Sequence, residues 1–515
     1  MLGPLTRRAA LALGASFAVA GPAEALAPGL FAVPALSSQA RRRFSGKTVV
    51  DIARQLSERP FVAPPATPER FRTLSYSQYR AIRYRKDRAI WRGEGVGFEL
   101  ELFAPGSVFN TPVAIDLVQR GISRPLAFDP ELFDWGEAAP TREEAARLGF
   151  TGFRVHSPLN RADYLDEFAV FQGASYFRGV AKGQAYGLSA RGLAINTAQA
   201  AGEEFPIFRK FWVERPTAGA GALVAHALLD SPSVAGAYRF GLYPGEVTAM
   251  EVSATLFPRR ALTHVGLGPL TSMYFFGWLG RQGVDDFRPE VHDSDGLAIL
   301  TGRGESIWRP LANPRTLQAS AFVDENPKGF GLLQRARTLD RYQDLEANYE
   351  RRPSLWVEPQ GAWGRGWVEL IEIPTDSEVN DNIVAYWRPE APIRAGRPFE
   401  LAYKLSWCAE APGAAPLARV TQSRSGKRES GARLFVIDYE GGPLAGLQGL
   451  DGVTVEASAS AGRIDNIVRQ PLPGGRGVRV SFDLDVGDAP LIELRVVPWQ
   501  GRAAAGETWL YRWTA

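Results

Sequence analysis

An alternating stretch near the C-terminus decides the fold class. It reads Val478-Arg479-Val480-Ser481-Phe482-Asp483-Leu484-Asp485-Val486. Every second side chain is apolar and those between are polar, which is the pattern of a strand with one buried face and one solvated face. Turn residues recur at the spacing of a sandwich in the residues around it. This part of the chain is therefore predicted to form an immunoglobulin-like β-sandwich.

Other parts of the chain show the same alternation. Phe98, Leu100 and Leu102 are predicted to face one side of a strand, with Glu99 and Glu101 on the other. The chain holds 53 glycines, 37 prolines and 11% aromatic residues, which favours many short strands joined by turns. We therefore expect a mainly β protein.

Helices are expected at two places. The apolar residues Val49, Ile52, Ala53 and Leu56 recur at helical spacing. Thr141, followed three residues later by Glu144, is the pattern of a capping box, and this second helix is predicted to end at Gly149.

A chain of 515 residues is too long for one ordinary core. Three prolines cluster in residues 388–398 without apolar periodicity, which is typical of a linker. We therefore place a domain boundary there and expect a large β-sandwich domain over residues 26–390 and an immunoglobulin-like domain over residues 391–515.

Residues 1–25 have the features of an export signal. Arg7 and Arg8 precede an apolar run from Ala9 to Ala20, and small residues follow. Cleavage is expected after Ala25, because a cut after Ala27 would leave a proline directly behind it. The paired arginines favour a twin-arginine signal, with a simple secretory signal as the alternative.

Charge and composition exclude several classes of protein. The net charge is only +3 and the arginines are scattered among acids, which argues against nucleic-acid binding. No apolar run beyond the signal is long enough to cross a bilayer, so no membrane span is expected in the mature protein. The single cysteine, Cys408, cannot form an internal disulfide. A chain with only one thiol suits an oxidising compartment, because it has little to oxidise.

The densest mixture of polar and aromatic residues runs from Tyr274 to Trp387. Sugar rings present apolar faces and many hydroxyls, so their binding sites need aromatic platforms beside carboxylates and amides. Cleavage of a glycosidic bond needs one protonated carboxyl and usually a second carboxylate. Asp293 and Asp381 are candidates for this pair, and Trp356 is a candidate for substrate binding.

Each of these features has a plainer explanation. Asp293-Ser294-Asp295-Gly296 fits an ordinary turn, and Asn380-Asp381-Asn382 fits a polar turn before a strand at residues 383–387. The tryptophans fit a hydrophobic core. The four histidines show no paired spacing, so we expect no metal, although His292 could orient Asp293. The glycine-rich segments lack the phosphate-loop pattern, and no cofactor is expected.

Several long sequence segments in this region resemble those of the periplasmic glucan biosynthesis G and D proteins. They run from Phe287 to Leu297, from Ile307 to Leu311, from Gly329 to Arg335, from Arg352 to Pro359 and from Asn380 to Val384. The resemblance covers nearly the whole mature chain. It implies a periplasmic protein with a galactose-mutarotase-like β-sandwich and a smaller immunoglobulin-like domain.

The resemblance also implies roles for individual residues. Some family members are inverting endo-hydrolases of β-1,2-glucan. By that similarity Asp381 is the general acid and Asp293 the base, while Tyr349 and Glu378 position the substrate or relay a proton through water. The features of the G-type and D-type subgroups are mixed in this chain.

Three functions remain open at this point. The first is a hydrolase that trims β-1,2-glucan without metal or nucleotide. The second is a non-catalytic glucan-binding factor that assists an inner-membrane glucosyltransferase. The third is a sugar-epimerising enzyme of the mutarotase type, which the lack of a catalytic histidine pair disfavours.

Overall fold

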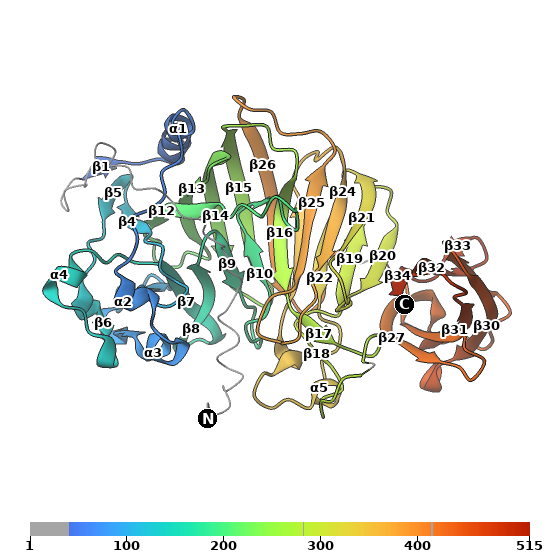
Figure 1. Ribbon diagram of the computed structural model, residues 1–515. Coiled ribbons are helices and arrows are strands. Elements are labelled where there is room, and N and C mark those ends of the chain that lie inside the picture. The colour runs from blue at the N-terminus through green and yellow to red at the C-terminus, as the bar shows by residue number, and fades with distance from the viewer. Residues whose placement is uncertain (1–40, 282, 414–415) are drawn as a thin grey trace. The chain divides into compact units, whose positions relative to one another are not determined.

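A computed structural model describes residues 41–281, 283–413 and 416–515 (Figure 1). The described chain is mainly β, as predicted, and its contacts divide it into two compact units. The first unit holds the described residues up to Gly183 together with Ser189–Gly268 and Ala391–Leu405. The second holds Gln184–Leu188, Pro269–Glu390 and Ser406–Ala515. The predicted export signal at residues 1–25 lies outside the described residues.

The first unit is a sandwich of two sheets. One sheet has the order β5-β4-β12-β13-β14-β15, and the other has the order β10-β9-β8-β7-β3. Two phenylalanines of the second sheet contact two of the first. The ring centroids lie 5.1 Å apart both in Phe153–Phe211 and in Phe171–Phe240. These edge-to-face contacts between the two layers form the core. The strands are β4 Ala114–Gln119, β5 Ile122–Pro125, β12 Ile207–Glu214, β13 Leu223–Asp230, β14 Val234–Tyr243, β15 Thr248–Pro258, β3 Glu99–Leu102, β7 Gly152–Arg161, β8 Tyr164–Gln172, β9 Tyr176–Gly179 and β10 Ser189–Arg191.

The helix predicted near the start of the described chain is confirmed as α1, Gly46–Ser57. Its apolar stripe, which includes Val49 and Ala53, packs on Trp212, Leu228 and other buried side chains of the first sheet. In Figure 1 this helix, in blue, lies beside β13 and β15.

Two local predictions need correction. The capping box at Thr141 and Glu144 is present, but the helix α4 ends at Ala145 rather than at Gly149. In β3, Glu101 does not face solvent. It is 3% exposed, and its carboxylate lies 2.5 Å from the guanidinium of Arg154 on the neighbouring strand, so a charge partner offsets the cost of burial.

The second unit contains strands with the order β23-β22-β19-β20-β34-β32-β29. β20 and β34 pair in parallel, which joins the middle of the chain to its C-terminal residues. A second layer in this unit includes β21, β24 and β25. The strands are β19 Gly296–Leu300, β20 Ser306–Pro310, β21 Gln318–Glu325, β22 Gly329–Leu333, β23 Ser354–Pro359, β24 Arg365–Glu372, β25 Ile383–Pro389, β29 Val453–Ala459, β32 Leu491–Gln500 and β34 Thr508–Thr514.

The C-terminal part of this unit is the predicted small β-sandwich. Its second sheet has the order β27-β28-β31-β30, with β27 Arg419–Lys427, β28 Arg433–Glu440, β30 Arg463–Pro471 and β31 Gly477–Asp485. The alternation in β31 is confirmed, because its apolar side chains are buried and those between are half-buried or exposed. Phe482 of β31 lies 6.4 Å from Trp509 of β34 across the core. The boundary between residues 390 and 391 stays a prediction.

No helix in the described ranges is long and apolar enough to cross a membrane. The single cysteine, Cys408, is buried at the end of β26, Phe399–Cys408.

Candidate functional site

Asp293, Tyr349, Glu378 and Asp381 lie on short elements and loops of the second unit or directly beside them. These are the paired strands β17 Tyr274–Phe276 and β18 Val291–His292, the helix α5 Leu339–Tyr342, the 3-10 turn η5 Tyr349–Arg351, and residues 373–382 between β24 and β25. In Figure 1, β17, β18 and α5 lie together at one end of the strands that include β22.

Asp293 directly follows β18 and is buried. Its backbone N–H donates to the carbonyl of Met273 at 2.8 Å, which fixes the start of the turn. Its carboxylate forms a hydrogen-bonded ion pair with Nη1 of Arg352, and the two side chains are only 4% and 1% exposed. The guanidinium of Arg352 also lies 4.1 Å from the ring centroid of Tyr349. The neighbouring cation stabilises the charged form of the Asp293 carboxylate.

Tyr349 and Glu378 are in direct contact. The Tyr349 hydroxyl donates to Oε2 of Glu378 at 3.2 Å, and Nη1 of Arg288 lies 2.6 Å from the same oxygen. Arg288 also binds Asp344 at 3.0 Å. Burial, and then the charge of Glu378, raise the pKa of Tyr349 well above its ordinary value, so its hydroxyl keeps its proton.

These contacts connect three predicted site residues. Asp293 pairs with Arg352, Arg352 stacks on Tyr349, and Tyr349 donates to Glu378. The sequence predicted Asp293, Tyr349 and Glu378, but not the arginines that hold them. Arg288 and Arg352 lie in the sequence segments that carry the family resemblance, but only the fold shows which carboxylates they bind.

Asp381 lies three residues after Glu378 on the loop before β25. Its neighbour Asn382 holds this loop, because its side-chain amide accepts from the Tyr274 backbone N–H at 2.8 Å and donates to the carbonyls of Tyr274 and Ile373 at 3.0 Å each. Asn382 therefore stabilises the loop through backbone hydrogen bonds, as the interpretation of this segment as a polar turn predicts. Oδ2 of Asp381, by contrast, is buried and has no hydrogen-bond partner among the described residues. An unsatisfied buried carboxylate oxygen is costly, and a bound water or a catalytic role is among the explanations of such a group.

Trp356 lies on β23 and is 4% exposed. Its indole packs on the backbone of β22, where a Cβ at Gly329 would stand 2.4 Å from the ring. It belongs to the apolar core shared with the C-terminal sandwich, and it also lines a cavity of about 160 Å³ beside Arg335 and Arg337. A role for Trp356 in substrate binding stays a prediction.

His292 does not orient Asp293. Its Nδ1 lies 3.0 Å from Oε1 of Gln334, and its Nε2 lies 3.1 Å from Oε2 of Glu290. Both ring nitrogens are thus engaged by residues other than Asp293, and Oδ1 of Asp295 is 3.6 Å from Nε2. Burial lowers the pKa of His292, but Asp295 and Glu290 outweigh it and the net shift is upward.

Comparison with known proteins identifies the family of this chain. Residues 44–513 match the family model described as "Periplasmic glucan biosynthesis protein, MdoG". The chain is 50% identical over 477 residues to Glucans biosynthesis protein G of Vibrio cholerae serotype O1, which covers 92% of this chain and 87% of the relative.

Two further relatives carry the same name. The protein from Shewanella frigidimarina is 51% identical over 483 residues, covering 92% of this chain and 85% of its own. The protein from Rhodopseudomonas palustris is 49% identical over 491 residues, covering 95% and 97%. With a family model matched over nearly all of its described length, this chain belongs to the periplasmic glucan biosynthesis protein family.

Proposed function

We propose that the protein is a periplasmic endo-hydrolase that cleaves β-1,2-linked glucan with inversion, and thereby processes the backbone of periplasmic glucans. The observation that carries the proposal is the connected set of Asp293, Arg352, Tyr349 and Glu378. The loop that holds Glu378 also holds Asp381, which has an unpartnered buried oxygen among the described residues. Inverting hydrolysis needs two carboxyl groups with different tasks, and these residues supply them.

In this proposal Asp381 is the general acid. A general acid must bring a proton to the leaving oxygen, so its carboxyl should not be held by a cation. The Oδ2 atom of Asp381 meets this requirement, since no group among the described residues bonds it. Asp293, whose charged form is stabilised by Arg352, is the base for the attacking water.

Tyr349 and Glu378 complete the proposal as groups that position the substrate or pass a proton through water. The Tyr349 hydroxyl can both donate and accept a hydrogen bond, and it already donates to Glu378. Export through a cleaved signal at residues 1–25 belongs to the same proposal, because the glucan of this family is periplasmic by its description.

Product analysis tests the proposal. The purified mature protein is incubated with linear β-1,2-glucan, and the oligosaccharides and the anomeric form of the first products are followed by NMR. Wild type is expected to release shorter chains of inverted configuration, and Asp381→Asn and Asp293→Asn are expected to release none. Asp376→Asn is the matched control, because Asp376 is an exposed acid of the same loop.

Two results would contradict the proposal. Equal cleavage by Asp381→Asn and wild type would remove Asp381 from the role of acid. Absence of cleavage by every form, with binding of the glucan retained, would instead favour a non-catalytic factor that hands the glucan to an inner-membrane glucosyltransferase.

A further inference from the structure

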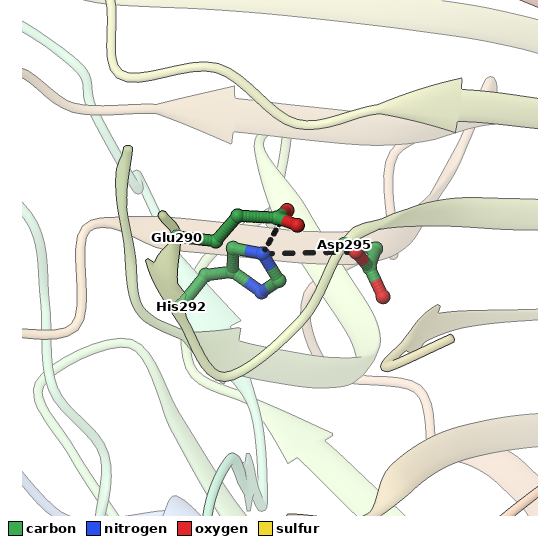
Figure 2. A group of neighbouring side chains, drawn as sticks. All are labelled: Glu290, His292 and Asp295. Atoms are coloured by element: carbon green, nitrogen blue, oxygen red, sulfur yellow. Dashed lines mark hydrogen bonds and ion pairs between the residues drawn. The ribbon is translucent and has the colours of Figure 1, made fainter. Parts of the chain in front are cut away.

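Three polar side chains converge around β18. Figure 2 shows Glu290, His292 and Asp295, with the two carboxylates approaching the same nitrogen of the imidazole. Nε2 of His292 lies 3.1 Å from Oε2 of Glu290 and 3.6 Å from Oδ1 of Asp295, and one atom from each residue lies within 4.8 Å of the other two. No step of the proposed hydrolysis uses these residues.

In each carboxylate, one oxygen is bound by a group outside this cluster and the other oxygen approaches the imidazole of His292. Nε of Arg341 lies 2.5 Å from Oε1 of Glu290. Oδ2 of Asp295 accepts hydrogen bonds from the backbone N–H groups of Arg335 and Ala336, the latter at 2.8 Å. The remaining oxygens, Oε2 of Glu290 and Oδ1 of Asp295, are the ones that approach the imidazole.

Gln334 decides which nitrogen of the imidazole carries the proton. Its Nε2 lies 3.0 Å from the carbonyl of His292 and 3.2 Å from that of Tyr349, and a carbonyl can only accept. Its Oε1 therefore faces Nδ1 of His292, so Nδ1 must donate. In the neutral ring, Nε2 then presents a lone pair to two carboxylate oxygens, and three acceptors meet with no donor between them.

Either a proton on Nε2 or a metal ion can stabilise this group of acceptors, and one ligand atom from each of the three residues lies within reach of a single ion. We propose that Glu290, His292 and Asp295 bind one divalent transition-metal ion, such as Zn²⁺. Bonds of about 2.1 Å to a tetrahedral or octahedral ion place neighbouring ligand atoms roughly 3.0 to 3.4 Å apart. The Nε2–Glu290 separation of 3.1 Å lies in this range, and the Nε2–Asp295 separation of 3.6 Å would have to shorten slightly. A mixed set of imidazole and carboxylate suits Zn²⁺ or Mn²⁺ better than Ca²⁺ or Mg²⁺.

The surroundings resemble those of known metal sites. A ligating histidine usually donates its other ring N–H to an oxygen, as His292 does to Gln334. The ring of Tyr274 stacks on the imidazole at 5.3 Å and Tyr342 meets its edge, which holds the ring plane. All three proposed ligands line a small hollow of about 40 Å³, which leaves room for water as a further ligand.

This site differs from the expectation that no metal is bound. That expectation rested on the absence of paired histidines, whereas the ligands here are one histidine and two acids spaced Glu-x-His-x-x-Asp. The segment from Glu290 to Asp295 includes Asp293, so the ion would have a positioning role. It would fix the turn that carries the proposed base without taking part in the reaction.

Cobalt binding tests the site independently of glucan cleavage. Protein stripped with a chelator is titrated with Co²⁺, whose visible absorption reports coordination by protein ligands, and then with Zn²⁺. Wild type is expected to give bands that saturate at one equivalent, lose them on adding Zn²⁺, and unfold at a higher temperature with either ion. His292→Gln and Asp295→Asn should lose the bands, and Gln334→Leu should weaken binding about 10- to 100-fold.

The controls separate this site from other histidine–carboxylate contacts and from the hydrolase. His226 is also buried and lies 2.8 Å from Glu214, yet this pair belongs to no group of three ligands among the described residues, so His226→Gln should bind Co²⁺ as wild type does. Asp381→Asn should also bind Co²⁺ normally, whatever its activity. Stripped, folded wild type that shows neither bands nor a shift in unfolding temperature with excess Co²⁺ or Zn²⁺ would overturn the proposal.

Discussion

The hydroxyl of Tyr349 donates a hydrogen bond to Oε2 of Glu378 at 3.2 Å. Both side chains were candidates from the sequence, 29 residues apart, and the fold brings them into contact. A tyrosine hydroxyl that is fixed by a carboxylate and stacked on an arginine has a defined orientation, which a proton relay through water requires.

Removing this hydroxyl is the direct test of the relay. Tyr349→Phe keeps the ring on Arg352 but cannot transfer a proton, so we expect kcat on β-1,2-glucan to fall by about 10²-fold or more. Steady-state kinetics with linear glucan measure it. Tyr342→Phe is the matched control, since its hydroxyl is also buried but donates only to the carbonyl of Ala336. Equal kcat values for wild type and Tyr349→Phe would exclude the relay.

The Asp293–Arg352 pair makes a prediction about stability. Arg352→Leu leaves a buried carboxylate without its cation, and we expect the free energy of unfolding to fall by about 3–5 kcal/mol. Adding Asp293→Asn should recover a large part of this loss, because the uncompensated charge is then gone. Urea denaturation of the two single variants and the double variant measures the coupling between the residues. Strictly additive effects would show that the pair does not stabilise the fold.

The sequence was informative where the determining signal is local. Alternation in residues 478–486 identified the buried face of β31, because neighbouring side chains of a strand point to opposite faces. The capping box at Thr141 marked the start of α4, but nothing local marked its end, and the helix is shorter than predicted. The parallel pairing of β20 with β34 joins residues about 200 positions apart, and no periodicity reports such a contact.

The same limit applied to the site. The resemblance named Asp293, Tyr349 and Glu378, but their partners could not be predicted from spacing. Arg352 binds Asp293 from 59 residues away, and Gln334 contacts His292 from 42 residues away. His292 was expected to orient its neighbour Asp293, but consecutive residues at the end of a strand point in opposite directions.

Asp438 in the C-terminal sandwich predicts a dependence of stability on pH. Its carboxylate accepts from Arg479 at 2.7 and 2.9 Å and from Arg424 at 3.1 Å. Burial raises the pKa of Asp438, but the hydrogen bonds and charges of the two arginines outweigh it and lower the pKa below its ordinary value. A lowered pKa in the folded state means that the stabilisation is complete above the unfolded value of about 3.9 and is lost as the pH falls through the folded value.

Asp438→Asn should therefore destabilise the protein by about 1–3 kcal/mol near neutral pH and by much less at about pH 3. Urea denaturation at the two pH values measures this difference. Asp488→Asn is the control, because Asp488 is exposed in the same sandwich and should change stability little at either pH. A penalty for Asp438→Asn that is the same at both pH values would contradict the assignment of the effect to its charge.

Cys408 predicts how the thiol reports on unfolding. It is 1% exposed, and burial raises the pKa of the thiol to about 12. The thiolate is the reactive form, so the native protein should not react with an alkylating or disulfide reagent at about pH 8, whereas a free thiol with its ordinary pKa of about 8.5 would react readily. In concentrated guanidinium one thiol per chain should react, and Cys408→Ala should show none.

Slow labelling of Cys408 under native conditions would then measure the opening of the protein around the end of β26, and this labelling should slow further in any variant that stabilises the second unit. Rapid, complete labelling of the folded protein would show that the end of this strand opens freely in solution.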